Sequence, residues 1–230
     1  MTESTTLPRF GDWIETYSGR KFHLLDCRPG DFDIVDIAHA LSFICRYNGH
    51  TKRFYSVAEH SLYISYACPP DLALWALLHD SPEAYIGDVT RPLKPYLKDY
   101  KAIERRIMAA ICEQFGLAPD QPPEIKELDS RILHNERRDM MADTSNPWNL
   151  PGEPIPGLVI EGFDTFSAYG LFMARFKELT DQGQSYYYLS DRERLAASLA
   201  AARAEFAARG GRFLDLEEIA DEVEARRNGA

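Results

Sequence analysis

The sequence lacks an excess of basic residues. Its 26 lysines and arginines face 36 aspartates and glutamates, so the 230 residues carry a formal net charge of -10 and a pI near 5.1. Proteins that bind nucleic-acid polymers normally present a basic face to the phosphate backbone. The charge balance therefore argues against a DNA or RNA partner, and any small anionic substrate has to meet local cations.

The sequence also lacks a long apolar run and a basic leader followed by an apolar stretch. A helix needs about 18 consecutive apolar residues to cross a bilayer, and a secretory signal begins with a basic region. We therefore expect a cytoplasmic protein that does not associate with membranes.

Cysteine is scarce, and its four copies form no C-x-x-C pair. They are widely spaced and stand in apolar or helical contexts, which argues against a disulfide framework or a cysteine-based metal site. We expect buried free thiols at Cys27, Cys45, Cys68 and Cys112.

Helical periodicity dominates the chain after residue 33. Apolar residues recur there at intervals of three and four, whereas residues 10–33 mix glycine, proline and β-branched residues in the manner of a short hairpin or irregular arm. Glycine and proline separate the periodic stretches. The predicted helices are 34–47, 56–68, 72–86, 98–115, 124–143 and 166–179, followed by an alanine-rich helical tail from about residue 190.

Consecutive helices with short connections predict an all-α bundle. Apolar residues make up 45% of the chain and charged residues 27%, as in ordinary globular proteins with a packed core. We divide the chain into an irregular N-terminal arm (1–33), one helical domain (34–180) and a helical C-terminal extension (181–230).

The dipeptide His79-Asp80 stands in the most apolar of these helices, "LALWALLHDSPEAYI". A buried carboxylate is costly unless it is paired or bound to a metal. For the dipeptide alone, a salt bridge or a hydrogen-bonded core histidine is the simpler interpretation. His60 on the preceding helix and Asp129 on a later one favour a metal site, because two imidazoles and two carboxylates suit Mn, Co, Fe or Zn and leave coordination positions open.

Further charged residues surround this set in the sequence. Glu83 follows His79 by four positions, so on a continuing helix it lies on nearly the same face, and Asp88 follows Gly87, where that helix should end. Each could instead be a solvent-facing or capping acid. Arg46 and Lys94 could be ordinary surface charges, but in an acidic chain they are also the cations that a phosphate ester would require.

Four stretches together resemble the HD-domain phosphohydrolases, in particular the bacterial 5′-deoxynucleotidases and the phage dATP triphosphohydrolases. They are "CRYNGHTKRFYSVAEHS", "LLHDSPEAYIGDVTRPLK", "YKAIE" and "KELDSRIL", and the similarity extends over roughly residues 36–139. The resemblance implies an HD-domain helical bundle in which His60, His79, Asp80 and Asp129 bind the metal. It implies that Glu83 and Asp88 are the catalytic and substrate-orienting acids, that Arg46 and Lys94 contact phosphate, and that Tyr47 lies beside the sugar.

Two absences refine this expectation. No histidine lies between His79 and His134, whereas the dinuclear HD enzymes need extra histidines there, so we expect one divalent transition metal. The HD-GYP signature of cyclic-dinucleotide phosphodiesterases is missing, since the pair continues as "SPEAYIGD".

The sequence thus predicts a metal-dependent hydrolase of small nucleotides, which converts (deoxy)nucleoside 5′-monophosphates to nucleoside and phosphate. A dNTP triphosphohydrolase that releases triphosphate is one alternative, and a metal-binding module that senses a nucleotide without hydrolysing it is another. The small nucleotide is the expected partner, and the C-terminal extension could join subunits of a homo-oligomer.

Overall fold

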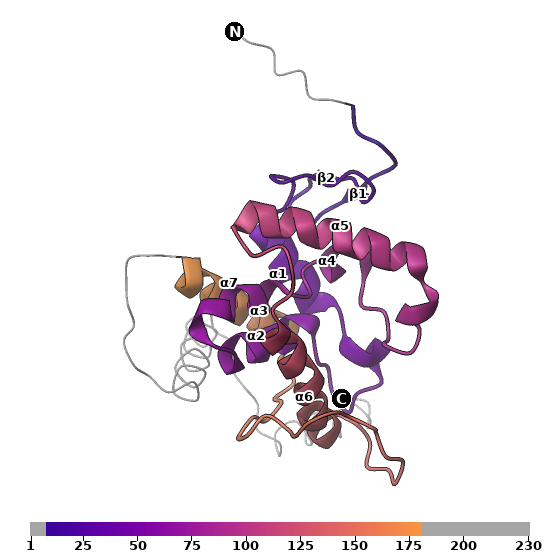
Figure 1. Ribbon diagram of the computed structural model, residues 1–230, viewed down its shortest axis with the longest axis vertical. Helices are drawn as coiled ribbons and strands as arrows, with labels where there is room; N and C mark the ends of the chain where they lie inside the picture. Colours follow the sequence, from indigo (N-terminus) through magenta and orange to yellow (C-terminus); the bar gives the residue numbers. More distant parts are fainter. Residues whose placement is uncertain (1–7, 181–230) are drawn as a thin grey trace, which may run out of the picture.

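A bundle of α-helices forms the protein in the computed structural model, which describes residues 8–180 (Figure 1). Its only sheet in this range is a two-stranded antiparallel hairpin, β1 (Ile14–Glu15) and β2 (Lys21–Phe22). The predicted all-α class is therefore confirmed for the described part. The predicted C-terminal extension, 181–230, lies outside the described residues.

Within residues 8–180, seven α-helices follow the hairpin, with three short 3₁₀ turns between them. The 3₁₀ turns are η1 (Arg46–Gly49), η2 (Pro70–Leu72) and η3 (Lys94–Tyr96). The helices are α1 (Ile34–Phe43), α2 (Val57–Ala67), α3 (Ala73–Leu78), α4 (Glu83–Ile86), α5 (Lys98–Phe115), α6 (Pro123–Met140) and α7 (Thr165–Thr180). None of them is long and apolar enough to cross a membrane.

Helix α2 is the centre of the bundle. Every residue from Val57 to Tyr66 is buried, because α1, α3, α6 and α7 pack around it. Ser56 caps its first turn by accepting a hydrogen bond from the Glu59 amide at 3.1 Å, as expected for a serine three residues before a glutamate. His60 is therefore held on a rigid element surrounded by protein.

The predicted helix 72–86 is broken into α3 and α4, which corrects the expectation that Glu83 lies on a continuing helix. Pro82 has no amide hydrogen and cannot donate to the Leu78 carbonyl. That carbonyl instead accepts from Ser81 at 3.0 Å, and the next turn closes from Glu83 to the Asp80 carbonyl at 2.9 Å. His79 and Asp80 consequently lie in a tight turn between two short helices.

The predicted helix 34–47 is also shorter than expected, because the chain after Phe43 pairs with the segment before α2. The Arg46 amide donates to the Tyr55 carbonyl at 2.8 Å, and the Val57 amide donates to the Ile44 carbonyl at 3.0 Å. Helix α6 begins and ends within three residues of the predicted 124–143. Arg46 therefore begins the 3₁₀ turn η1, next to the bridge between Cys45 and Ser56, and does not lie at the end of a longer α1.

The N-terminal arm packs into the bundle. Phe22 and Phe32 are buried against Tyr85, with ring centroids 3.9 Å and 5.6 Å from it. The buried Asp36 carboxylate of α1 accepts hydrogen bonds from the amide and hydroxyl of Ser18 at 2.7 and 2.8 Å. The arm thus completes the core beside α4.

All four cysteines are free, as expected. Cys27, Cys68 and Cys112 are buried, whereas Cys45 is partly exposed.

The segment before α7 is held by the buried Glu59 and the exposed Arg53. The Glu59 carboxylate accepts from the amides of Gly162 and Phe163, each at 2.8 Å. Arg53 donates to the carbonyls of Glu161 and Ile160 at 2.6 and 2.7 Å. Because its site is buried, the pKa of Glu59 is raised to about 7.

We expect Gly162→Ala to destabilise the fold more than Gly157→Ala. Both glycines have positive φ, +74° and +70°, so alanine costs roughly 1 kcal/mol of strain at either position. A Cβ at Gly162 would also lie 2.6 Å from Arg53 Nε, whereas one at Gly157 would meet nothing within 4 Å. Displacing Arg53 from the carbonyls of Glu161 and Ile160 should lower the free energy of unfolding by about 1–3 kcal/mol more. Urea unfolding of both variants measures this difference. Equal stabilities of the two variants would show that Arg53 can move away from the new Cβ without cost.

Candidate metal centre

Two buried imidazoles face one another at the centre of the bundle. His60 comes from α2 and His79 from the turn after α3, and their ring centroids lie 5.3 Å apart. The Nε2 atoms of both rings are buried and have no hydrogen-bond partner. A buried polar atom without a partner is costly, so these two nitrogens indicate a binding site.

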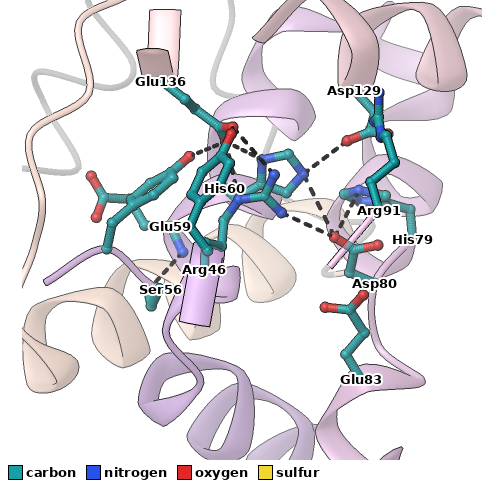
Figure 2. A network of polar contacts seen from close by, with 12 residues as sticks. Arg46, Ser56, Glu59, His60, His79, Asp80, Glu83, Arg91, Asp129 and Glu136 are labelled. Atoms are coloured by element: carbon teal, nitrogen blue, oxygen red, sulfur yellow. Dashed lines mark hydrogen bonds and ion pairs between the residues drawn. The ribbon is translucent and has the colours of Figure 1, made fainter. Parts of the chain in front are cut away.

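Carboxylates complete the arrangement around these nitrogens (Figure 2). His60, His79 and Asp129 each offer a ligand atom, and these atoms lie within 4.8 Å of one another, so this group could hold a metal ion. Asp80 lies beside the group, with Oδ2 3.2 Å from Nε2 of His79 and 3.6 Å from Nε2 of His60. The fold thus brings all four predicted ligands together.

The other ring nitrogen of each histidine has a fixed partner. Nδ1 of His79 donates to the Ala76 carbonyl at 2.7 Å, and Nδ1 of His60 donates to Glu136 Oε1 at 2.9 Å. A proton on Nδ1 leaves the Nε2 lone pair available to a metal. Both imidazoles are therefore held in the tautomer that a metal ligand requires.

Sequence reasoning missed Glu136, which is fully buried two helical turns after Asp129 on α6. Its carboxylate contacts His60, accepts from the Tyr55 hydroxyl at 2.8 Å and from the Tyr47 hydroxyl, and pairs with Arg46 Nε at 3.1 Å. Burial alone would raise its pKa, but the Arg46 charge and the hydrogen bond from His60 hold the pKa of Glu136 well below its ordinary value. The seven-residue spacing from Asp129 was the available signal, since it places both carboxylates on one helical face.

Arg46 connects Glu136 with the metal group. Its side chain is 12% exposed, and Nη1 lies 3.9 Å from Asp80 Oδ2. Tyr47 and Asn48 follow it in the left-handed region, at φ 55° and 50°. Such backbone conformations are uncommon for residues other than glycine and are often found at functional sites.

Burial and neighbouring charges shift the pKa values of the predicted metal ligands. Burial lowers the pKa of His60, as does Arg46, but the adjacent carboxylates of Asp129 and Glu136 outweigh both and raise it to about 9. Burial would raise the pKa of Asp80, yet the neighbouring His79 and His60 hold it far below its ordinary value. Burial would raise the pKa of Asp129, but the contact with His60, 3.3 Å away, lowers it. Without metal, the ionised carboxylates thus favour a protonated His60, and a metal ion would replace the proton on Nε2.

Glu83 lies beside these carboxylates at the start of α4, almost fully buried. Burial, followed by the charges of Asp80 and Asp88, raises the pKa of Glu83 well above its ordinary value. One of its oxygens accepts from Lys94 Nζ at 3.1 Å, and the other is buried without a hydrogen-bond partner. Glu83 is therefore a protonatable group next to the predicted ligands.

Lys94 and Asp88 lie near Glu83. Lys94 pairs with Glu83 and with Glu104, each at 3.1 Å, so in this structure its charge is shared by two carboxylates. Burial raises the pKa of Asp88. The charge of Arg46 lowers this pKa and that of Asp80 raises it, and the net shift is upward. All nine predicted site residues thus lie in or beside one region.

We expect Glu136→Gln to weaken metal binding by roughly 10- to 100-fold, because residues that orient a ligating histidine have effects of this size. Glutamine keeps the shape of the side chain but removes the charge that holds His60 and Arg46. Glu136→Ala should in addition destabilise the fold by about 3–5 kcal/mol, since it leaves Arg46 buried without its main counter-charge.

Metal titration and urea unfolding check these effects, with Glu127→Gln as the control. Glu127 is on the same helix, and its side chain is 67% exposed. Wild-type metal affinity in Glu136→Gln would mean that the Glu136 charge does not position His60.

Two known proteins are similar to this chain. It is 41% identical over 174 residues to the uncharacterized protein YfdR of Escherichia coli K12, an alignment that covers 74% of this chain and 96% of that protein. It is 43% identical over 124 residues to an uncharacterized protein of Rhodobacter capsulatus, covering 50% of this chain and 63% of that one. No model of a known protein family matches the chain.

Proposed function

The chain belongs to the family of Escherichia coli YfdR, and from its site we propose that it is an HD-type, metal-dependent phosphohydrolase of small nucleotides. The reaction is hydrolysis of (deoxy)nucleoside 5′-monophosphates to nucleoside and phosphate. One observation carries the proposal: the partnerless Nε2 atoms of His60 and His79 converge with Asp129. A buried arginine and a buried protonatable acid lie next to them.

The four residues fit a divalent transition metal. The two imidazoles offer Nε2 atoms held in the correct tautomer, and Asp80 and Asp129 offer ionised carboxylates. This mixed nitrogen and oxygen set suits Mn, Co, Fe or Zn and leaves coordination positions open. A metal held there would supply Lewis acidity, which lowers the pKa of water and offsets the charge of a phosphate ester.

Arg46 supplies the cation for the phosphate. Its guanidinium is almost buried and lies between Glu136 and Asp80, so the site provides a local positive charge in an acidic protein. A guanidinium presents several N–H donors in a plane and suits phosphate oxygens well. Lys94 can add a second positive charge when it leaves one of its two carboxylate partners.

Glu83 transfers the proton. Burial and the charges of Asp80 and Asp88 raise its pKa and so favour the protonated carboxyl group. It can give this proton to the leaving oxygen or take one from the attacking water. Asp88, with its own raised pKa, orients the substrate beside it.

A nucleotide panel tests the proposal. Metal-free protein is incubated with Mn, Co, Mg or Zn and with dNMPs, NMPs and dNTPs, and the products are identified. We expect orthophosphate from the monophosphates. Triphosphate from a dNTP would assign the protein to the triphosphohydrolases instead, and a lack of any product with every metal would leave a nucleotide-sensing module.

Binding of the metal is tested separately by thermal unfolding. A ligand that binds only the folded state raises the melting temperature as its concentration increases. We expect the effective metal to do so, and a melting temperature unaffected by any of these metals would contradict the metal centre.

A further inference from the structure

Trp148 lies next to Tyr47, on a loop that the proposed reaction does not use. The two ring centroids are 5.9 Å apart, at an interplanar angle of 44°. The Arg137 guanidinium lies 5.7 Å from the centroid of the indole. Two aromatic rings and one cation therefore lie together, and the indole is only partly buried.

The loop that carries Trp148 is fastened to α6. Arg137 donates to the Asn146 carbonyl at 2.6 Å, His134 contacts the Pro151 carbonyl at 3.2 Å, and Arg131 donates to the Glu153 carbonyl at 2.9 Å. These bonds hold the chain on both sides of the tryptophan. The indole is thus presented at a defined place, which a binding surface requires.

A hollow of about 410 Å³ adjoins this cluster through Arg137. It is lined by His134, Arg137, Arg138, Ala142, Asp143 and Thr144. It is an open surface depression whose lining offers hydrogen-bond donors and acceptors, and Arg137 belongs both to this lining and to the cluster with Trp148. Such a combination suits a flat heterocycle with polar edges.

Tyr47 connects this surface with the metal centre. Its hydroxyl donates to Glu136, which in turn holds the metal-facing His60 at 2.9 Å, while its ring faces Trp148. The left-handed backbone at Tyr47, φ 55°, directs the ring into this position at some cost in strain. The same tyrosine therefore borders both the aromatic surface and Glu136, the residue that orients His60.

We propose that Trp148 and Arg137, together with the ring of Tyr47, bind the nucleobase of the substrate whose phosphate lies at the metal centre. The inference rests on the proposed function. Aromatic side chains stack on any base, and a guanidinium adds cation–π attraction and hydrogen bonds to the base edge. This surface would make the enzyme selective for nucleotides over other phosphate esters.

Two substrates with the same phosphate ester test this inference. We expect Trp148→Ala to raise KM for a deoxynucleoside 5′-monophosphate by about tenfold, with kcat little changed, since base stacking is lost. Its KM for deoxyribose 5-phosphate, which has no base, should equal that of the wild type. Trp148→Phe should restore most of the affinity for the nucleotide.

Trp13→Ala is the control, because Trp13 is also partly exposed but stacks with Lys21 on the hairpin. Equal KM values of wild type and Trp148→Ala for the nucleotide would overturn the inference while leaving the proposed reaction intact. If the wild type releases no phosphate from any substrate, equilibrium dialysis with the free nucleoside replaces the assay. Binding that is lost in Trp148→Ala would then support the base site by itself, and equal binding would overturn it.

Discussion

Asp129→Ala is expected to purify without bound metal and to release no phosphate above background. Asp129 Oδ1 lies 3.3 Å from His60 Nε2, and the carboxylate belongs to the only group of possible ligands found in residues 8–180. Removing it leaves fewer ligands and less negative charge at the centre, so a divalent cation binds far more weakly. Asp80→Ala should behave in the same way, because that carboxylate contacts both imidazoles.

Elemental analysis beside a phosphate-release assay measures both effects. Glu127→Ala is the matched control: it removes a carboxylate from the same helix α6, two residues before Asp129, but its side chain is 67% exposed and pairs only with Arg131 among the contacts seen. The control should keep its metal and its rate. A fully active Asp129→Ala would exclude Asp129 from the metal centre.

Glu83→Gln should keep the metal but lose roughly 10²- to 10⁴-fold in kcat, the usual contribution of a general acid or base. Glutamine has the shape of the carboxyl group yet cannot transfer a proton. The predicted ligands are untouched, so metal content and thermal stabilisation by metal should equal those of the wild type. Metal analysis and a rate assay on the same preparation separate this variant from Asp129→Ala.

Glu104→Gln is the control that the structure offers for Glu83. Both carboxylates lie 3.1 Å from Lys94 Nζ, but the side chain of Glu83 is 4% exposed and that of Glu104 is 26% exposed. If the loss in Glu83→Gln came only from releasing Lys94, Glu104→Gln would show a similar loss. Full activity of Glu83→Gln would remove Glu83 from the mechanism.

The helices were predictable from the sequence because a helix that buries one face has a local, repeated pattern. The apolar spacing after residue 33 predicts the observed helices, and Ser56 marks the start of α2. The prediction failed at two places, for different reasons. The backbone bonds from Arg46 to Tyr55 and from Val57 to Ile44 end α1 early, whereas the local effect of Pro82 breaks the helix that was expected to carry Glu83.

The predicted ligands were also accessible from the sequence, because a histidine or aspartate in an apolar helix needs a compensating partner. His60, His79, Asp80 and Asp129 do come together at one point of the bundle. Residue type and spacing identify atoms that can bind a metal, but they do not identify the groups that orient those atoms.

Tertiary structure alone decided those orienting contacts. Glu136, Tyr55 and Arg46 come from different elements. The seven-residue spacing puts Glu136 on the helical face of Asp129, but no local pattern predicts that Tyr55 and Arg46 meet it there. The same holds for Trp148, which approaches Tyr47 only because arginines of α6 bind the carbonyls of its loop. Patterns along a chain report which face of an element is buried, whereas the partner that meets a buried charge depends on how distant elements pack, and only the folded chain determines that.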